Sequence, residues 1–126
     1  MSVAVQVHAD SVTELISLLS NYVEATEKQD VSLADSVFHE KFRVLVVTPQ
    51  GVREINRSHY IEALETNKVG GKVRTMAIES IDTFGAITQV RVTLTSSDTV
   101  FLDRLQILKD TTGWKIINSL TEVKPL

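Results

Sequence analysis

The sequence of 126 residues contains no cysteine, two prolines and three histidines. Without cysteine the chain can form neither disulfides nor thiolate metal sites, and it offers no cysteine nucleophile. Its longest aliphatic run, residues 44–47, is far too short to cross a bilayer. Because the N-terminus also lacks a basic segment followed by an apolar one, we expect no secretory signal and place the protein in the cytoplasm.

Positive charge is not in excess either, since thirteen Lys and Arg face sixteen Asp and Glu, for a net charge of -3. Nucleic acids and anionic membranes select basic surfaces, so we expect neither as a partner. The histidines lack the spacing of metal ligands, and no cofactor or metal is expected. With 43% hydrophobic and 23% charged residues, the composition is typical of a globular chain, and we expect a single domain over residues 1–126.

Apolar residues recur at helical spacing in three segments, which predicts three helices. The first covers residues of about 11–28, where Ser11 begins a capping-box pattern. Asp30 is the expected cap of a second, shorter helix. A third begins near Asn56 or Ser58 and ends before a pair of consecutive glycines, which favour a turn.

Between and after these helices the apolar residues alternate, which predicts strands. One strand, over residues 42–47, turns back at a Pro-Gln-Gly sequence. Further strands are expected at residues of about 72–83, 87–95, 99–109 and 114–123. Helices followed by a meander of strands indicate an α+β fold, with the helices covering one face of a curved antiparallel sheet.

The last hairpin gives a sharper prediction about which side chains are buried. A four-residue loop at 110–113 would place Asp103 opposite Leu120, and would put Trp114 and Asn118 on the same buried face. A slip of one residue or a bulge would reverse these assignments. In the stated register, the outer face of the hairpin carries Leu102, Ile117 and Ser119.

A carboxyl group among apolar neighbours must be protonated or find a partner, and this makes Asp103 a candidate site residue. In one interpretation it is a pocket acid that donates a hydrogen bond at neutral pH. In the other it bonds Tyr22 or a helix N–H and only fixes the sheet. Asn118 and Trp114 have similar alternatives, as cavity lining or as structural residues.

Two stretches of the sequence carry a family resemblance. YVEATEKQDVSLADSVF, residues 22–38, resembles the helix–turn–helix opening of the nuclear transport factor 2-like superfamily. FLDRLQILKDTTGWKIINSL, residues 101–120, resembles its final hairpin, and more closely the branch described as putative lumazine-binding, related to polyketide cyclase-like proteins. The resemblance implies a cone-shaped, cystatin-like sheet wrapped around a long first helix, a cavity at its open end, and a homodimer formed through the outer sheet face.

The resemblance also implies roles for particular residues. In the ketosteroid isomerase of this superfamily an Asp base moves a proton while a helix Tyr and a protonated Asp hold the oxyanion. By motif, that Tyr falls on Tyr22 and the protonated Asp on or near Asp103. The base falls on Val46, which cannot accept a proton, so isomerisation by that mechanism is not expected here.

His59, beside Tyr60 at the start of the third helix, is the best substitute base because an imidazole titrates near neutrality. Its alternative role is that of a solvent-facing helix residue, and Tyr60 would lie at the cavity mouth. The expected function is binding of a small, partly apolar metabolite, with or without acid–base catalysis of the isomerase or dehydratase type. A non-catalytic protein-interaction or dimerisation module with a filled cavity is the alternative. The candidate catalytic residues are Asp103, Tyr22 and His59, and the candidate substrate-binding residues are Asn118, Trp114 and Tyr60.

Overall fold

The computed structural model describes the backbone of residues 8–126 and the side chains from residue 12 onward. Within this part of the chain, none of the helices is long and apolar enough to span a membrane. The helices are α1 (His8–Glu27), α2 (Val31–Val37) and α3 (Arg57–Glu65). The first begins before the predicted cap, Ser11, whose side chain lies outside the described ones.

The caps of the two shorter helices follow the sequence signals. Asp30 Oδ1 accepts the backbone N–H of Leu33 at 3.0 Å at the start of α2. Asn56 Oδ1 accepts that of His59 at 2.9 Å at the start of α3. Each side chain satisfies a backbone donor of the first turn that has no partner inside its helix. The predicted cap Asp30 is confirmed, and of the two predicted starts of the third helix, Asn56 is the cap while Ser58 lies inside α3.

The strands of the described chain form one six-stranded sheet in the order β2-β1-β6-β5-β4-β3. They are β1 (Phe38–Thr48), β2 (Gly51–Asn56), β3 (Thr75–Phe84), β4 (Ile87–Thr95), β5 (Thr99–Asp110) and β6 (Gly113–Pro125). All neighbours are antiparallel except β1 and β6, which run parallel, so the sheet is mixed and not purely antiparallel as predicted. β6 is the last strand of the meander β3 to β6 and lies beside β1 in the sheet. The chain runs through these two strands in the same direction.

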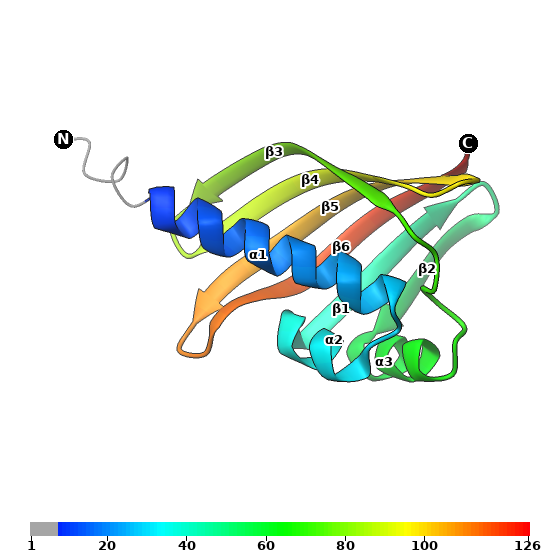
Figure 1. The fold of residues 1–126 in the computed structure, drawn as a ribbon, viewed down its shortest axis with the longest axis horizontal. Coiled ribbons are helices and arrows are strands. Elements are labelled where there is room, and N and C mark those ends of the chain that lie inside the picture. Colours follow the sequence, from blue (N-terminus) through cyan, green and yellow to red (C-terminus); the bar gives the residue numbers. More distant parts are fainter. Residues whose placement is uncertain (1–7) are drawn as a thin grey trace.

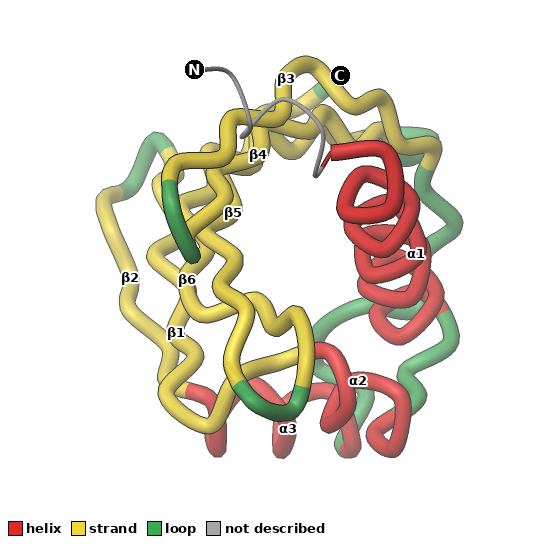
Figure 2. The backbone as a smooth tube through the Cα atoms, turned by 90° about the vertical axis from the view of Figure 1, so that its left-hand side faces the viewer, coloured by secondary structure: helices red, strands yellow, loops and turns green. Residues whose placement is uncertain are grey.

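The curved sheet wraps around α1, which crosses its concave face (Figure 1). Seen end-on, the strands, α1 and the two short helices surround a common interior (Figure 2). Buried side chains of α1, such as Leu15 and Leu19, share one apolar cluster with Val92, Leu105 and Ile107 of the sheet. The predicted α+β fold class, with three helices and a curved sheet, is confirmed for the described residues.

A β-bulge in the last hairpin changes the predicted register. The pair Lys109–Trp114 forms next to the hairpin loop as predicted. Between Gln106 and Ile107 the register then shifts by one residue, which leaves Ile117 as the extra residue of β6. Because side chains alternate along a strand, every later residue of β6 faces the side opposite to the predicted one.

The bulge therefore corrects four assignments. Asp103 pairs with Thr121 and not with Leu120. Ser119, predicted on the outer face, turns inward and is buried together with Thr121. Asn118 and Leu120, predicted to be buried beside Asp103, lie on the outer face, where Leu120 is 37% exposed.

Candidate functional site

A cavity of ≈ 520 Å³ lies between the C-terminal half of α1, the concave sheet face and the loop that follows α3. Its apolar walls are formed by Phe42, Val44, Val46, Ile55, Val69, Phe101 and Val123. Its hydroxyl-bearing and ionisable side chains are Tyr22, Thr26, Thr48, Arg53, Tyr60, Lys68, Lys72, Arg74, Asp103, Ser119 and Thr121. Apolar walls combined with convergent polar groups are typical of small-molecule sites.

Asp103 forms the polar floor of this cavity, held by three hydroxyl donors. Tyr22 Oη, from α1, donates to Asp103 Oδ2 at 2.7 Å. Ser119 and Thr121, both brought inward by the bulge, donate to Oδ1 at 2.7 and 2.8 Å. Both carboxyl oxygens are thus occupied by groups of the protein itself, and Asp103 links helix to sheet.

Burial is the largest influence on the pKa of this carboxyl group. It raises the pKa of Asp103, while the hydrogen bonds from Ser119, Tyr22 and Thr121 and the charge of Arg74 act in the opposite direction without cancelling it. Burial, followed by the nearby Asp103 carboxylate, raises the pKa of Tyr22 well above its usual range. Tyr22 is consequently a permanent hydrogen-bond donor at physiological pH.

Tyr60 is the aromatic donor that the protein leaves available. Its ring packs edge-on against Phe38 and Phe42, with centroid separations of 5.4 and 5.7 Å. Burial raises the pKa of Tyr60 to about 12, although Arg74 lowers it somewhat. No hydrogen bond to another described residue engages its hydroxyl, which lines the cavity, so this O–H can donate to a bound molecule.

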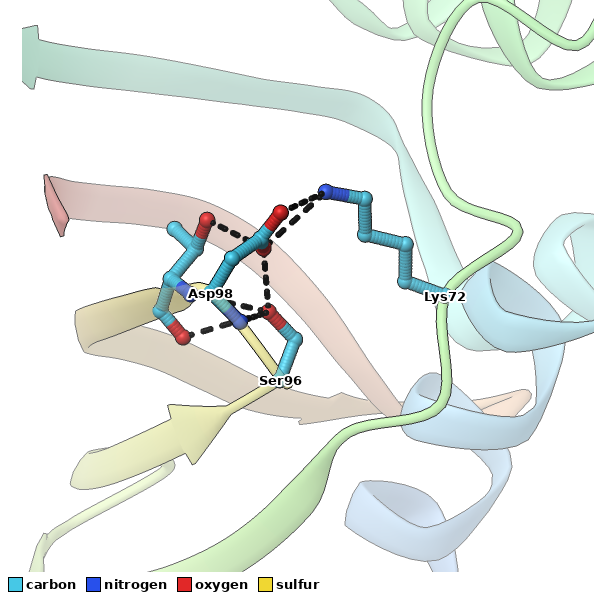
Figure 3. Close-up of polar contacts among 4 residues, drawn as sticks. Lys72, Ser96 and Asp98 are labelled. Atoms are coloured by element: carbon cyan, nitrogen blue, oxygen red, sulfur yellow. Dashed lines mark hydrogen bonds and ion pairs between the residues drawn. The ribbon is translucent and has the colours of Figure 1, made fainter. Parts of the chain in front are cut away.

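An ion pair fastens the loop after α3 to the turn between β4 and β5 (Figure 3). Lys72 Nζ lies 3.1 Å from both carboxylate oxygens of Asp98. The same carboxylate accepts hydrogen bonds from Thr99 Oγ1 and Ser96 Oγ, at 2.9 and 3.1 Å. The bonds from Thr99, Lys72 and Ser96 together lower the pKa of Asp98, so this carboxyl group is ionised at neutral pH.

Arg74 ends that loop, and its side chain reaches the cavity. Its Nη2 donates to the buried Thr26 Oγ1 at 2.6 Å. The guanidinium carbon lies 4.9 Å from the centre of the Phe101 ring, a cation–π arrangement. The backbone N–H of Arg74 donates to Glu27 Oε1 at 2.9 Å. These contacts hold the guanidinium beside an apolar wall of the cavity.

Three of the six candidate site residues line the cavity together, namely Tyr22, Asp103 and Tyr60. His59 does not: it is exposed, and its backbone N–H belongs to the first turn of α3. As a result, the predicted substitute base lies outside the site. Among the described residues, no group of His, Asp and Glu is placed to hold a metal ion.

The other two candidates are also placed elsewhere. Asn118 lies on the outer face because of the bulge, where its Nδ2 donates to Gln106 Oε1 at 3.1 Å. Trp114 lies near the hairpin loop, several residues along the sheet from the cavity, and its Nε1 donates to Glu14 Oε2 at 2.8 Å. Trp114 therefore has a packing and anchoring role, and neither residue contacts the cavity.

Sequence reasoning missed eight of the eleven hydroxyl-bearing or ionisable side chains of the site, and four of them show why. Ser119 and Thr121 escaped it because the register was displaced by one residue beyond the bulge. Lys72 and Arg74 escaped it because they lie in a loop, where no periodicity indicates the direction of a side chain. One signal was available in the sequence: Ser119 and Thr121 are two positions apart in β6. Their hydroxyl groups therefore lie on the same face of the strand and form a polar patch there.

The curved sheet, the central helix and the cavity define a nuclear transport factor 2-like fold. A protein of that fold and of unknown function from Silicibacter pomeroyi DSS-3 is 20% identical to this chain, covers 92% of it and 98% of its own length, and superimposes with a TM-score of 0.81. One from Shewanella baltica OS155 is 18% identical over 94% of this chain and 98% of its own, with a TM-score of 0.82. A superfamily member from Salmonella enterica serovar Typhimurium is 18% identical over 90% and 92%, with a TM-score of 0.69.

The family itself is defined by sequence. Residues 10–120 match the family described as "Putative lumazine-binding", and the chain belongs to that family. A comparison with curated proteins finds no significant match. The structural likenesses, at these identities, establish the fold.

Proposed function

We propose that this protein binds a small, partly apolar molecule in the cavity between α1 and the sheet. The observation that carries the proposal is the open volume of ≈ 520 Å³, within the range of roughly 300–1,000 Å³ typical of small-molecule sites. An interaction module with a filled cavity would not leave this space. The description of the family also supports a small-molecule ligand, without identifying it.

The polar groups of the cavity are suited to orient such a molecule. The hydroxyl of Tyr60 can donate to a carbonyl or similar acceptor, because no described residue uses it. The Asp103 cluster supplies a polar floor, and the aliphatic and aromatic walls take the apolar part. Tyr60→Phe, which removes one hydroxyl and keeps the ring, should weaken an acceptor-bearing ligand by about tenfold and leave an apolar one unaffected.

The cavity carries fewer of the groups that acid–base catalysis needs. Asp103 and Tyr22 line the cavity as the resemblance implied, but each is bonded to the other. With His59 outside the site and Val46 at the position of the family base, no cavity residue is assigned to accept a proton. Binding without turnover therefore fits the site better than an isomerase or dehydratase reaction.

A fluorescence titration with the neutral dye N-phenyl-1-naphthylamine tests the proposal. Val46→Trp places an indole in the cavity, and Gln89→Trp places the same group on the exposed outer face of β4. Saturable dye binding by the natural chain and Gln89→Trp, together with its loss in Val46→Trp, supports a ligand in the cavity. Equal binding by all three chains, or by none, contradicts it.

We also propose that a second copy of the chain covers the outer sheet face. Apolar side chains gather there on three adjacent strands, and Leu45 lies beside the exposed Leu120 in the register of β1 and β6. Val47 and Leu102 flank Glu122 of the same strand β6. Leu120→Glu should convert a dimer to a monomer in light scattering, while a monomeric natural chain would contradict this assembly.

A further inference from the structure

Positive side chains dominate the ionisable lining of the cavity. Arg53, Lys68, Lys72 and Arg74 contribute cations, whereas Asp103 is the only acidic side chain among the described residues that line it. The chain as a whole carries a net charge of -3, so this sign is opposite to that of the protein. A basic cavity in an acidic protein favours an anionic guest over a neutral or cationic one.

Asp103 forms no ion pair with these cations, although the charge of Arg74 acts to lower its pKa. Its two carboxyl oxygens accept the three hydroxyl bonds described above. Lys72 already has its own partner in Asp98. Among the described side chains, by contrast, no carboxylate forms an ion pair with Arg53, Lys68 or Arg74.

Arg74 is the best placed of the three unpaired cations. It is partly buried, and within the described part of the chain its guanidinium makes one hydrogen bond, to Thr26, while stacking on Phe101. A guanidinium has further N–H donors in a rigid plane that matches the two oxygens of a carboxylate. Because Thr26 and Phe101 fix its position before any ligand arrives, little side-chain freedom is lost on binding.

We propose that the ligand is an organic acid with an apolar body, and that Arg74 pairs with its anionic group. This inference rests on the proposed function, since it names the class of molecule that the cavity takes. The apolar body lies against the valine and phenylalanine walls. Lys68 and Arg53 add positive electrostatic potential without a fixed contact to the ligand. The loop that ends at Arg74 is tied to the turn between β4 and β5 by the ion pair of Lys72 with Asp98, and it holds Arg74 over the cavity.

Two dyes that share one apolar body test the charge preference directly. 8-Anilinonaphthalene-1-sulfonate is N-phenyl-1-naphthylamine with an added sulfonate. Arg74→Gln should weaken the sulfonate dye at least about tenfold and the neutral dye by less than about threefold. Arg91→Gln, which removes the same charge from the outer face, should change neither. Arg74→Lys, which keeps the charge, should restore most of the lost affinity.

The dependence of dye affinity on salt concentration tests the same charge preference on the natural chain, without any substitution. Raising ionic strength from about 0.05 to about 0.5 M should weaken the sulfonate dye and leave the neutral dye unchanged or slightly tighter. If Arg74→Gln weakens the binding of both dyes equally, or of neither, the inference about an anionic ligand is overturned. The cavity proposal is then still supported by binding of the neutral dye to the natural chain and its loss in Val46→Trp. If the neutral dye does not bind the natural chain, the proposed function fails, and the inference fails with it.

Discussion

Tyr22 of α1 donates its hydroxyl to Asp103 of β5 across 2.7 Å, and this bond joins two residues that are 81 positions apart in the sequence. Both groups are buried, and the bond lies at the floor of the cavity. It joins α1 to the curved sheet at the floor of the cavity, where one end of a bound ligand would lie. The stability of the fold and the electrostatics of the cavity therefore depend on the same pair.

Tyr22→Phe removes this donor and leaves Asp103 Oδ2 without a partner among the described residues. We expect the free energy of unfolding to fall by about 1–3 kcal/mol at neutral pH, since a buried acceptor loses its hydrogen bond. Tyr60→Phe is the matched control, because the hydroxyl of Tyr60 has no partner among those residues. Urea unfolding of both variants checks this, and an equal loss in the two would contradict the role of the bond.

Asp103→Asn should change how stability depends on pH. Because burial raises the pKa of folded Asp103 above its ordinary 3.8, the folded chain holds a proton that the unfolded chain has already released. The stability gained from that proton is complete below pH 3.8 and is lost as pH rises through the raised folded-state pKa. Asparagine does not titrate, so the Asp103→Asn variant lacks this pH-dependent contribution to stability.

Denaturant unfolding at a series of pH values measures the effect. The free energy of unfolding of the natural chain, minus that of Asp103→Asn, should decrease as pH rises from about 4 and then become constant. Other groups titrate in both proteins and cancel in the difference. A difference that increases over this range would mean that the hydroxyl donors outweigh burial and that the pKa of Asp103 is lowered.

Gly70 offers a test of the loop that carries Arg74. Its φ is +73°, and a Cβ there would lie 2.1 Å from the backbone oxygen of Thr26, which also accepts the N–H of Gly71 at 2.9 Å. Gly85 has a similar φ of +68° with open space around a Cβ. Gly85→Ala should cost about 1 kcal/mol, from the left-handed backbone alone, and Gly70→Ala about 3 kcal/mol or more.

Thermal and urea unfolding of the two variants separate these effects. The excess loss in Gly70→Ala should be accompanied by weaker binding of the sulfonate dye, because the loop must move away from Thr26. Equal losses in the two glycine variants would show that the loop accommodates the methyl group without moving.

The sequence predicted the parts of the fold that depend on local chemistry. Asp30 and Asn56 each accept a first-turn N–H, and a helix cap is readable wherever such a residue precedes an apolar period. A bond between Tyr22 and Asp103 is one of the two interpretations that the buried carboxyl group allows, and the family resemblance places both residues in one site. Local rules alone do not relate residues of two distant elements.

The bulge at Ile117 could not be predicted, for a physical reason. Ile116 and Ile117 are both apolar, so the sequence does not show which of them begins the new alternation. The sheet buries Ile116 and then Ser119, which needs the Asp103 carboxyl as a partner. That partner lies on another strand, β5. The sequence prediction did not consider this pairing, and it therefore placed Asn118 on the wrong face of the sheet.

Chemical-shift mapping is the most direct test of the central claim that a small molecule binds between α1 and the sheet. In ¹H–¹⁵N spectra recorded during titration with N-phenyl-1-naphthylamine, the account predicts saturable shifts at the amides of cavity residues, such as Tyr60, Phe101 and Ser119. The amides of outer-face residues of β4 that are not next to a cavity residue in the sequence, such as Gln89 and Arg91, should remain in place. Saturable shifts confined to the outer face would contradict the account.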